Sequence, residues 1–504
     1  MHVDYIGVDT GTTGVKAVVF DEKGQERYKA YETYPMQSPT PDAAEQDPDL
    51  IYKKTISVLE QAIAFSNEDV HELRAVSFSS AMHSLMCVDS QGRPLTNLIT
   101  WADKRSSAET KALQHSDSGQ QFYERTGTPI HPMSPFAKLL WLKTHKPELL
   151  NRTAKVIGIK EYIFYQLFGE FVMDESIASA TGMNIHERAW DQEIVTYAGI
   201  TIEQLPELVP TSFTFYKDHI PYIIGASDGV LSNLGVGAIN EGEVALTIGT
   251  SAAIRSASST PHVDAKGRTF CYLLTDDLWI IGGPINNGGI ALQWVVEELV
   301  KDETVSSDQA VETVLALADR VPAGSNGLFF IPFLTGERAP LWNPEATASY
   351  IGLTRTHTRE DMIRAALEGV TFNIYSVLLA LQELIGFPGS IYASGGFSRS
   401  ETWKQMAADI FDQPLHFAKS YESSALGAVI LSMYTLGDIE SLSHFKQHQH
   451  VDEKVIPNET STSLYRDYSS LYLELIRSLS PHYERLYALQ QKKRRSDLGI
   501  KVAH

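Results

Sequence analysis

Residues 5–20 read YIGVDTGTTGVKAVVF, and this stretch decides the fold. The apolar runs on either side predict two β-strands, and the glycine- and threonine-rich segment between them predicts a tight turn. Glycine lets the backbone bend sharply, so several N–H groups point to one place and threonine hydroxyls add donors beside them. A chain of phosphate groups would bind there. The candidate phosphate ligands are Gly11, Thr12, Thr13 and Lys16.

Asp9 ends the first of these strands, beside the turn. A carboxylate suits Mg²⁺, so Asp9 is the candidate metal residue, acting through water on an ion bound to the phosphates. The turn is not a Walker A loop, because no Gly-Lys-Ser/Thr follows it, and it leads into a strand rather than the helix of a dinucleotide fingerprint. A hairpin that binds no ligand is equally compatible with this stretch taken alone.

A second stretch repeats the pattern, which favours ligand binding. Residues 243–255 read EVALTIGTSAAIR, again a strand, a glycine-threonine turn and a strand. Two such hairpins in two halves of one chain indicate two related lobes that face a nucleotide from opposite sides. Residues 391–400, IYASGGFSRS, then predict a strand that runs through two glycines into a helix. Such a junction is where an α/β sheet commonly binds a ligand.

Composition narrows the class of protein. The 504 residues are enough for two large domains. With 62 acidic and 42 basic residues the formal charge is −20, which argues against nucleic acid or an anionic membrane as a partner. Two cysteines, Cys87 and Cys271, lie in apolar runs and indicate packing in a reducing compartment. We found no basic-then-apolar leader and no apolar stretch of about 18 residues, so we expect a cytoplasmic protein.

Strands alternate with helices along the chain, which is typical of an α/β fold. Asp47 is the expected cap of a helix that runs to about Phe65, and a long helix is expected over residues 359–385. The polar residues 235–241 are the expected hinge between the halves. A single helix is expected over residues 463–490 near the end of the chain.

Two longer motifs turn these features into a resemblance. Residues 133–145, MSPFAKLLWLKTH, and residues 348–368, ASYIGLTRTHTREDMIRAALE, match the signatures of the FGGY carbohydrate kinases. The two glycine-threonine turns and the Gly395-Gly396 junction resemble the phosphate and adenosine loops of the wider sugar kinase/Hsp70/actin superfamily. The similarity extends over essentially the whole chain.

The resemblance implies an α/β fold of two actin-like (ribonuclease H-like) domains with a cleft between them. The expected ranges are 1–237 for the sugar-binding domain and 238–504 for the adenosine-binding domain. Four runs, residues 77–84, 126–133, 158–163 and 225–233, most resemble bacterial members that act on gluconate. The implied reaction is transfer of the ATP γ-phosphoryl group, with Mg²⁺, to the 6-hydroxyl of D-gluconate, which gives 6-phospho-D-gluconate for the pentose phosphate pathway. A homodimer is common among such relatives.

The resemblance also implies roles for single residues. Asp228, at the end of a buried strand and the start of a helix, matches the catalytic aspartate that accepts the proton of the attacking hydroxyl. A plain helix N-cap is the alternative for Asp228. Gln293, expected near the ribose, has a solvent-facing glutamine as its alternative. The other nucleotide-side candidates are Gly249 and Thr250 at the β-phosphate, Gly289 near the ribose, and Gly395, Gly396 and Ser400 at the adenosine.

Four side chains are candidates for binding the sugar acid together with Asp228. His83 follows a strand and has ring nitrogens that hydrogen-bond hydroxyls, although a structural histidine is the alternative. Trp101 would pack on the carbon chain, or it is a core residue. Asp103 would accept from hydroxyls, or it pairs with Arg105. Lys160 would bind the carboxylate, or it is solvated.

Three other functions stay open at this point. The closest rival is a kinase of xylulose or another polyol or ketose in the same family. A remote rival is an actin- or Hsp70-like ATPase that switches conformation without a sugar substrate. A sugar-responsive regulator would require a DNA-binding segment, and no basic helix-turn-helix precedes Asp4.

Overall fold

A computed structural model describes residues 2–67, 71–114, 116–300, 307–418, 422–443, 446 and 451–497. The chain divides into two compact units, and each is assembled from separate stretches of sequence. Unit 1 comprises Met1–Val244, Arg255–Ile281 and Ser420–His450, and unit 2 comprises Ala245–Ile254, Gly282–Lys419 and Val451–His504. Neither unit is a single continuous half of the chain.

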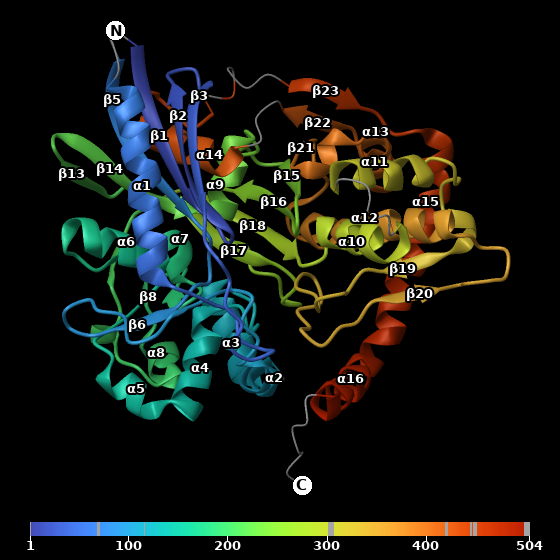
Figure 1. Ribbon diagram of the computed structural model, residues 1–504, viewed down its shortest axis with the longest axis horizontal. Helices are drawn as coiled ribbons and strands as arrows, with labels where there is room; N and C mark the ends of the chain where they lie inside the picture. The colour runs from blue at the N-terminus through green and yellow to red at the C-terminus, as the bar shows by residue number, and fades with distance from the viewer. Residues whose placement is uncertain are drawn as a thin grey trace. The chain divides into compact units, whose positions relative to one another are not determined.

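A six-stranded sheet forms the centre of unit 1 (Figure 1). Strands β1 and β2 are the predicted hairpin and pair antiparallel from Asp4 opposite Asp21 to Thr10 opposite Val15. Strand β5 pairs parallel with β1, and β14 pairs parallel with β5. The order across the sheet is β13 (Thr214–Lys217), β14 (Ile220–Ser227), β5 (His71–Ser80), β1 (His2–Thr10), β2 (Gly14–Asp21) and β3 (Glu26–Thr33).

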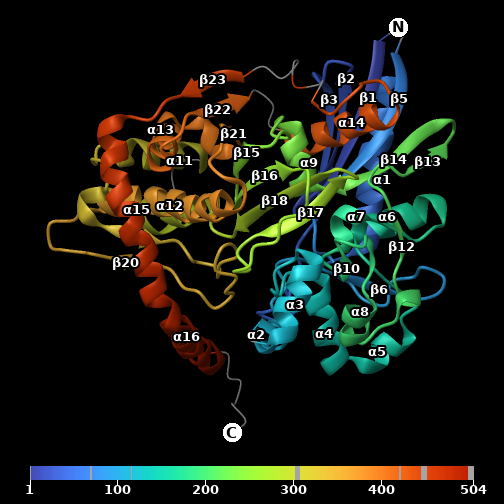
Figure 2. The same cartoon turned by 180° about the vertical axis from the view of Figure 1, so that it is seen from behind.

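Helices cover both faces of this sheet, because its strands bury side chains on both sides. On one face, Ile6 and Val8 pack against α1 (Pro48–Ser66) and α6 (Ile159–Phe168). On the other face, Tyr5 and Val18 pack against α9 (Asp228–Gly235) and α14 (Ser423–Thr435). Figure 1 has α1 in front of the sheet, and Figure 2 shows α14 from the opposite side. A helix from near the end of the chain thus completes the core around its first strands.

Gly225 interrupts the pairing of β14 with β5 just before Asp228. The register shifts between Ile223 and Ala226, and Gly225 has a φ of 68°. A Cβ at this position would lie 1.7 Å from the carbonyl oxygen of Phe78. The strand therefore requires glycine at this bulge, which sets the direction in which β14 delivers Asp228.

A smaller α-rich region completes unit 1 below the sheet in Figure 1. Its apolar core includes Phe122, Leu139 and Val195, which come from three helices. Its elements are β4 (Glu45–Gln46), β6 (Met86–Val88), β7 (Leu98–Ile99), α2 (Ser107–Gln114), α3 (Asp117–Thr126), α4 (Pro135–His145), α5 (Pro147–Arg152), β8 (Lys155–Ile157), β9 (Val172–Asp174), α7 (Glu175–Ala178), β10 (Met183–Asn184), β11 (Ala189–Trp190), α8 (Gln192–Ala198) and β12 (Glu207–Val209).

The second large sheet has the order β17, β18, β16, β15, β21, β22 and β23. Its strands are β15 (Glu243–Ile248), β16 (Ala252–Ser258), β17 (Phe270–Thr275), β18 (Leu278–Ile285), β21 (Ser390–Ser394), β22 (Leu415–Ala418) and β23 (Val451–Val455). Strand β17 belongs to unit 1, and β15, β16 and β18 each contribute residues to both units. Unit 2 also contains α10 (Gly289–Val295), α11 (Ser307–Ala318), β19 (Phe329–Ile331), β20 (Ser349–Ile351), α12 (Arg359–Ile385), α13 (Glu401–Phe411), α15 (Glu459–Leu479) and α16 (Tyr483–Asp497).

By its length and composition alone, helix α12 could span a membrane. Of its most apolar window, 83 % is buried inside the structure. At its start, Thr358 accepts from the Asp361 N–H and Asp361 accepts from the Thr358 N–H, which forms a capping box. Helix α12 is therefore a core helix of unit 2.

The strands and helices follow the predictions closely, with one clear exception. Asp47 caps α1, and the long predicted helix is α12. The helix expected over residues 463–490 is instead two helices, α15 and α16, which are separated by a 3-10 turn at Ser480–His482. Pro481 lies in that turn, and proline lacks the N–H that a continuous helix needs. Cys87 and Cys271 are free and buried, as expected.

Candidate active site

The first glycine-threonine turn is held by side chains from three other segments of unit 1. Within the turn, the Gly11 N–H donates to the Gly14 carbonyl at 3.0 Å. The Tyr34 hydroxyl donates to the Gly11 carbonyl at 2.6 Å. Gln46 Nε2 donates to the Thr12 carbonyl at 2.7 Å. These bonds engage carbonyl groups of the turn, which leaves the backbone conformation well defined.

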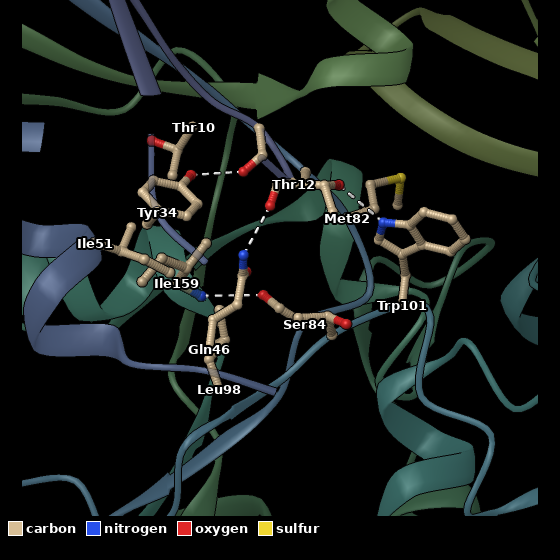
Figure 3. Close-up of a pocket in the computed structure, with 13 residues that line it drawn as sticks. Thr10, Thr12, Tyr34, Gln46, Ile51, Met82, Ser84, Leu98, Trp101 and Ile159 are labelled. Carbon is tan, nitrogen blue, oxygen red and sulfur yellow. Dashed lines mark hydrogen bonds between the residues drawn. The ribbon is translucent and has the colours of Figure 1, made fainter. Parts of the chain in front are cut away.

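Trp101 links the turn to the predicted sugar residues. Its Nε1–H donates to the Thr12 hydroxyl oxygen at 2.9 Å (Figure 3). One predicted phosphate ligand and one predicted sugar ligand are therefore in direct contact. Both side chains line the same pocket, together with Met82, Ser84 and Tyr34.

The pocket beside the turn has a polar side and an apolar side. Figure 3 shows Gln46, Ser84 and the two threonines Thr10 and Thr12 on its wall. The apolar lining comes from Ile51, Met82, Leu98 and Ile159. Polar groups next to apolar surface are typical of the lining of small-molecule sites.

Asp9 and Lys16 form an ion pair at the base of the turn. Asp9 is buried, accepts from the Ser79 hydroxyl at 2.8 Å and lies 3.2 Å from Lys16 Nζ. Lys16 Nζ also lies 2.6 Å from Glu422, which pairs with Lys29 at 3.0 Å. Burial opposes the charge of Lys16, but Asp9 and Glu422 outweigh it and raise the pKa of Lys16 above its ordinary value. The lysine is a permanent cation next to the turn.

The oxygen atoms near Asp9 show what kind of metal ion this residue could bind. Among the described residues, no group of three or more His, Cys, Asp or Glu side chains is placed to hold a metal ion. Asp9 supplies one carboxylate and Ser79 one hydroxyl beside it. This set is too small to hold an ion by itself. It fits an ion that arrives on a phosphate chain and keeps most of its waters.

Asp228 begins helix α9 at the end of strand β14. Ser227 is the cap of this helix, since its hydroxyl accepts from the Val230 N–H at 3.3 Å. The cap role considered for Asp228 therefore belongs to its neighbour. Asp228 is half-buried, and one of its carboxylate oxygens accepts from the Gly229 N–H at 2.7 Å. Ser424 on α14 donates to its carbonyl at 3.3 Å, so α14 also helps to fix this residue.

His83 has a strained backbone that other residues stabilise. Its φ is 68°, in the left-handed region that few residues other than glycine adopt. The buried Lys138 donates from Nζ to the His83 carbonyl at 2.9 Å and also to the Met133 carbonyl. The ring of His83 lies 6.1 Å from that of Tyr272 on β17. Burial lowers the pKa of Lys138 to about 7, although Asp103 opposes this.

Asp103 and Lys160 each have a charged partner inside unit 1. Asp103 is buried, lies 2.8 Å from Arg105 Nη2, and accepts from the Ala44 N–H at 2.9 Å. This is the Arg105 pairing that was the alternative for Asp103. Lys160 Nζ lies 2.7 Å from Asp174, and both side chains are buried. Lys160 is not the solvated lysine of the alternative. A role of either residue in sugar binding stays a prediction.

In unit 2, the second turn and the Gly395-Gly396 junction lie together at the end of β15. The Gly249 N–H donates to the Ser251 carbonyl at 2.8 Å, and the Gly289 N–H donates to the Gly249 carbonyl at 2.6 Å. Gly395 has a φ of 100°, and a Cβ there would lie 2.4 Å from the Ile248 carbonyl oxygen. Only glycine allows this close approach of the backbones. Gly249, Thr250, Gly289 and Gly395 are therefore neighbours, as a shared nucleotide site requires.

Of the other three predicted residues of unit 2, Gly396 begins a 3-10 turn at Gly396–Arg399, and Ser400 and Gln293 differ in environment. Ser400 is buried and caps α13, where its hydroxyl accepts from the Trp403 N–H at 3.2 Å. Gln293 is exposed on α10 and donates to Glu297 at 2.8 Å. Exposure was the alternative considered for Gln293, and its role near the ribose stays a prediction.

Sequence reasoning missed two residues near the acceptor side of unit 1. Arg255 on β16 lies against the start of α9, and Tyr272 on β17 lies beside His83. A signal existed for Arg255, because it is a lone charge after the apolar residues Ala252, Ala253 and Ile254. No local signal marks Tyr272.

Comparison with known protein families decides the class. The N-terminal domain of the FGGY family of carbohydrate kinases matches residues 4–235, and the C-terminal domain of the family matches residues 244–436. The chain belongs to the FGGY family of carbohydrate kinases. This FGGY kinase is therefore an α/β protein of the actin-like type, and membership in a kinase family implies the use of ATP. An ATPase switch without a sugar substrate has no support from these matches.

The relatives of this FGGY kinase include enzymes that are named for two different acceptor substrates. It is 44 % identical to the gluconokinase of Bacillus licheniformis, over 96 % of this chain and 98 % of that one. It is 27 % identical to the xylulose kinase of Bacillus subtilis, over 87 % of this chain and 89 % of that one.

Two solved structures are similar to this FGGY kinase at 35 % identity, and both come from Lactobacillus acidophilus. One is described as a gluconate kinase and has a TM-score of 0.91 over 96 % of this chain and 100 % of that one. The other is described as a ligand-bound xylulose kinase and has a TM-score of 0.90 over the same shares.

Proposed function

We propose that the chain is an ATP-dependent kinase of D-gluconate that phosphorylates the 6-hydroxyl group. The observation that carries this proposal is the 44 % identity to a gluconokinase over nearly the full length of both chains, against 27 % for a xylulose kinase.

In the proposed reaction, Asp228 accepts the proton of the 6-hydroxyl as this oxygen attacks the γ-phosphorus, the bond from the γ-phosphorus to the β,γ-bridging oxygen breaks, and ADP leaves with that oxygen. Its position at the end of β14, fixed by the Gly229 N–H and by Ser424, supports this role. Phosphoryl transfer needs mainly alignment and neutralisation of charge. Thr12, Thr13 and the cation of Lys16 would act on the terminal phosphate, and Gly249 and Thr250 on the β-phosphate.

Mg²⁺, when bound to the nucleotide, neutralises phosphate charge. Asp9 is the residue that would orient its waters, because Ser79 fixes one carboxylate oxygen and leaves the other toward Lys16. Chelation of divalent ions by EDTA should abolish turnover, and added Mg²⁺ should restore it.

An assay of ADP release over four acceptors tests the proposed substrate. D-Gluconate should give the highest kcat/KM among gluconate, xylulose, glycerol and ribulose. Mass analysis should identify the product as a hexonate monophosphate, and loss of reactivity toward periodate at C6 should locate the phosphate. Absence of turnover with gluconate would overturn the proposal.

Xylulose is the second candidate acceptor. The observation in its favour is the similar structure described as a ligand-bound xylulose kinase, with a TM-score of 0.90 and the same 35 % identity as the gluconate kinase structure. A kcat/KM for xylulose above that for gluconate in the same assay would select this function.

A further inference from the structure

A sugar acid carries a negative charge that a binding site must neutralise. Most cations around the proposed acceptor site already have anionic partners. Lys160 lies 2.7 Å from Asp174 inside the core, and Arg105 lies 2.8 Å from Asp103. Arg188 lies 2.6 Å from Glu175. Removing a cation from such a buried pair leaves the other charge uncompensated, so these residues are poor ligands for a second anion.

Arg255 differs from these cations in its position. It belongs to the segment Arg255–Ile281 of unit 1, the same unit as Asp228. Nε and Nη2 of Arg255 lie 3.4 Å from the point that a Cβ on Gly229 would occupy. The guanidinium therefore lies over the first turn of α9, one residue after the proposed base. The same segment carries Tyr272, whose ring faces His83, so this segment forms part of the acceptor side.

Arg255 also has a hydrogen-bonding group without a partner. Its Nη1 is buried and makes no hydrogen bond to any residue within the described ranges. Burial lowers the pKa of Arg255 to about 10, although the charge of Asp228 opposes this, so the side chain remains a cation at neutral pH. A buried donor without an acceptor costs free energy, and more so when it is charged. An anionic ligand would remove this cost.

Building on the proposed function, we infer that Arg255 binds the carboxylate of the sugar-acid acceptor and thereby selects acids over neutral polyols. A guanidinium presents parallel N–H groups that match the two oxygens of a carboxylate. Five carbon-carbon bonds of about 1.5 Å separate C1 from C6 of a hexonate. In this proposal Arg255 would contact the carboxylate at C1 and Asp228 the 6-hydroxyl at the other end of the chain, and the Lys160–Asp174 pair would stay intact.

The test compares D-gluconate with sorbitol, which has the same six carbons and a hydroxymethyl group in place of the carboxylate. Affinities are measured by calorimetry without nucleotide, and turnover is measured with ATP. The variants are Arg255→Met, which keeps the length without the charge, and Arg255→Lys, which keeps the charge without the planar fork. Arg93→Met, which removes an arginine that is 72 % exposed, is the matched control.

In Arg255→Met, we expect gluconate to bind about tenfold to a hundredfold more weakly, the usual effect of losing a charge-assisted bond. Sorbitol affinity and the KM for ATP should change less than twofold. Arg255→Lys should give an intermediate loss, and Arg93→Met should match the wild type. A wild-type preference for gluconate over sorbitol that shrinks in Arg255→Met is the decisive result.

Three outcomes would overturn the inference. They are an equal loss for gluconate and sorbitol, an unchanged gluconate affinity in Arg255→Met, and a wild type that binds both compounds equally. An equal drop in kcat for both acceptors would assign Arg255 to the transferred phosphoryl group instead. Because binding is measured separately, a wild type that prefers gluconate in calorimetry but does not phosphorylate it would refute the proposed function and leave the role of Arg255 supported. If Arg255→Met does not fold, the loss in Arg255→Lys decides.

Discussion

At the scale of single residues, a substitution of Asp228 tests the proposed reaction most directly. One of its carboxylate oxygens accepts from the Gly229 N–H at the start of α9. Asp228→Asn keeps the shape of the side chain and removes its ability to accept a proton. We expect kcat to fall about 10²- to 10⁴-fold while affinities for ATP and gluconate change little.

An assay of ADP release measures kcat of Asp228→Asn, and calorimetry measures its affinities for ATP and gluconate. Asp276→Asn is a suitable control, because the Asp276 side chain is 78 % exposed in the same unit. Near-normal turnover in Asp228→Asn would remove Asp228 from the role of base. A loss confined to ligand affinity would make it a binding residue instead.

A second residue-scale prediction concerns Glu161, next to Lys160. Burial raises the pKa of Glu161 to about 7; Lys160 opposes this rise and Asp174 adds to it. Between its ordinary value near 4.5 and pH 7, the unfolded chain loses the proton while the folded protein keeps it. Stability should therefore fall as pH rises through this window, by on the order of 1–3 kcal/mol.

Glu161→Gln removes this titration but keeps an oxygen for the Gly158 N–H, which now donates to Glu161 at 2.7 Å. As pH rises from 4.5 to 7, the free energy of unfolding of the variant should increase relative to that of the wild type. Above pH 7 this difference between the two proteins should stay constant. Thermal unfolding at several pH values measures it, with the exposed Glu170→Gln as control. A difference that does not depend on pH would contradict the prediction.

At the scale of elements, the bulge in β14 controls where Asp228 lies. Gly225→Ala would place a Cβ 1.7 Å from the Phe78 carbonyl oxygen at a φ of 68°. We expect a loss of about 2–4 kcal/mol in stability, together with lower kcat, since β14 must shift to make room. Gly169→Ala is the matched control: it also has positive φ, at 80°, but nothing lies within 4 Å of the added Cβ. That change should cost only about 1 kcal/mol.

Elements formed by local patterns were predictable from the sequence. The two glycine-threonine hairpins, the cap of α1 by Asp47 and the strand-to-helix junction at Asp228 each depend on residues within a few positions. The break between α15 and α16 differs from the prediction because Pro481 interrupts a stretch that is otherwise helical on both sides.

The candidate site was predictable only in part, because several contacts join distant segments. Lys16 pairs with Glu422, four hundred residues further along the chain, and Tyr272 faces His83. Lys160 was recognised as a cation, but the sequence gives no sign that Asp174 lies 2.7 Å from it. Pairings of this kind depend on the tertiary fold, and neither spacing nor propensity encodes them.

At the scale of the whole molecule, unit 1 is completed by α14, which follows most of unit 2 in the sequence. Ser423 on α14 lies 2.9 Å from Ser232 on α9, hydroxyl to hydroxyl, and Ala425, Val429 and Leu431 share the core of Tyr5 and Val18. A fragment of residues 1–244 should therefore expose the apolar face that α14 covers. We expect this fragment to lack a cooperative thermal transition and to bind a hydrophobic dye. The full chain should unfold cooperatively and should not bind the dye.

Addition of a peptide that spans residues 422–443 should reduce dye binding by the fragment. A scrambled peptide of the same composition is the control. A fragment that unfolds cooperatively on its own would show that α14 is dispensable for the core of unit 1.

The position of α14 also has a consequence for biosynthesis. A ribosome that adds about 5–20 residues per second reaches residue 435 only after some tens of seconds. During that time the first sheet has emerged but lacks the helix that covers one side of it. Selection should therefore favour translation pauses or chaperone contacts that protect this nascent sheet until the codons of α14 have been translated.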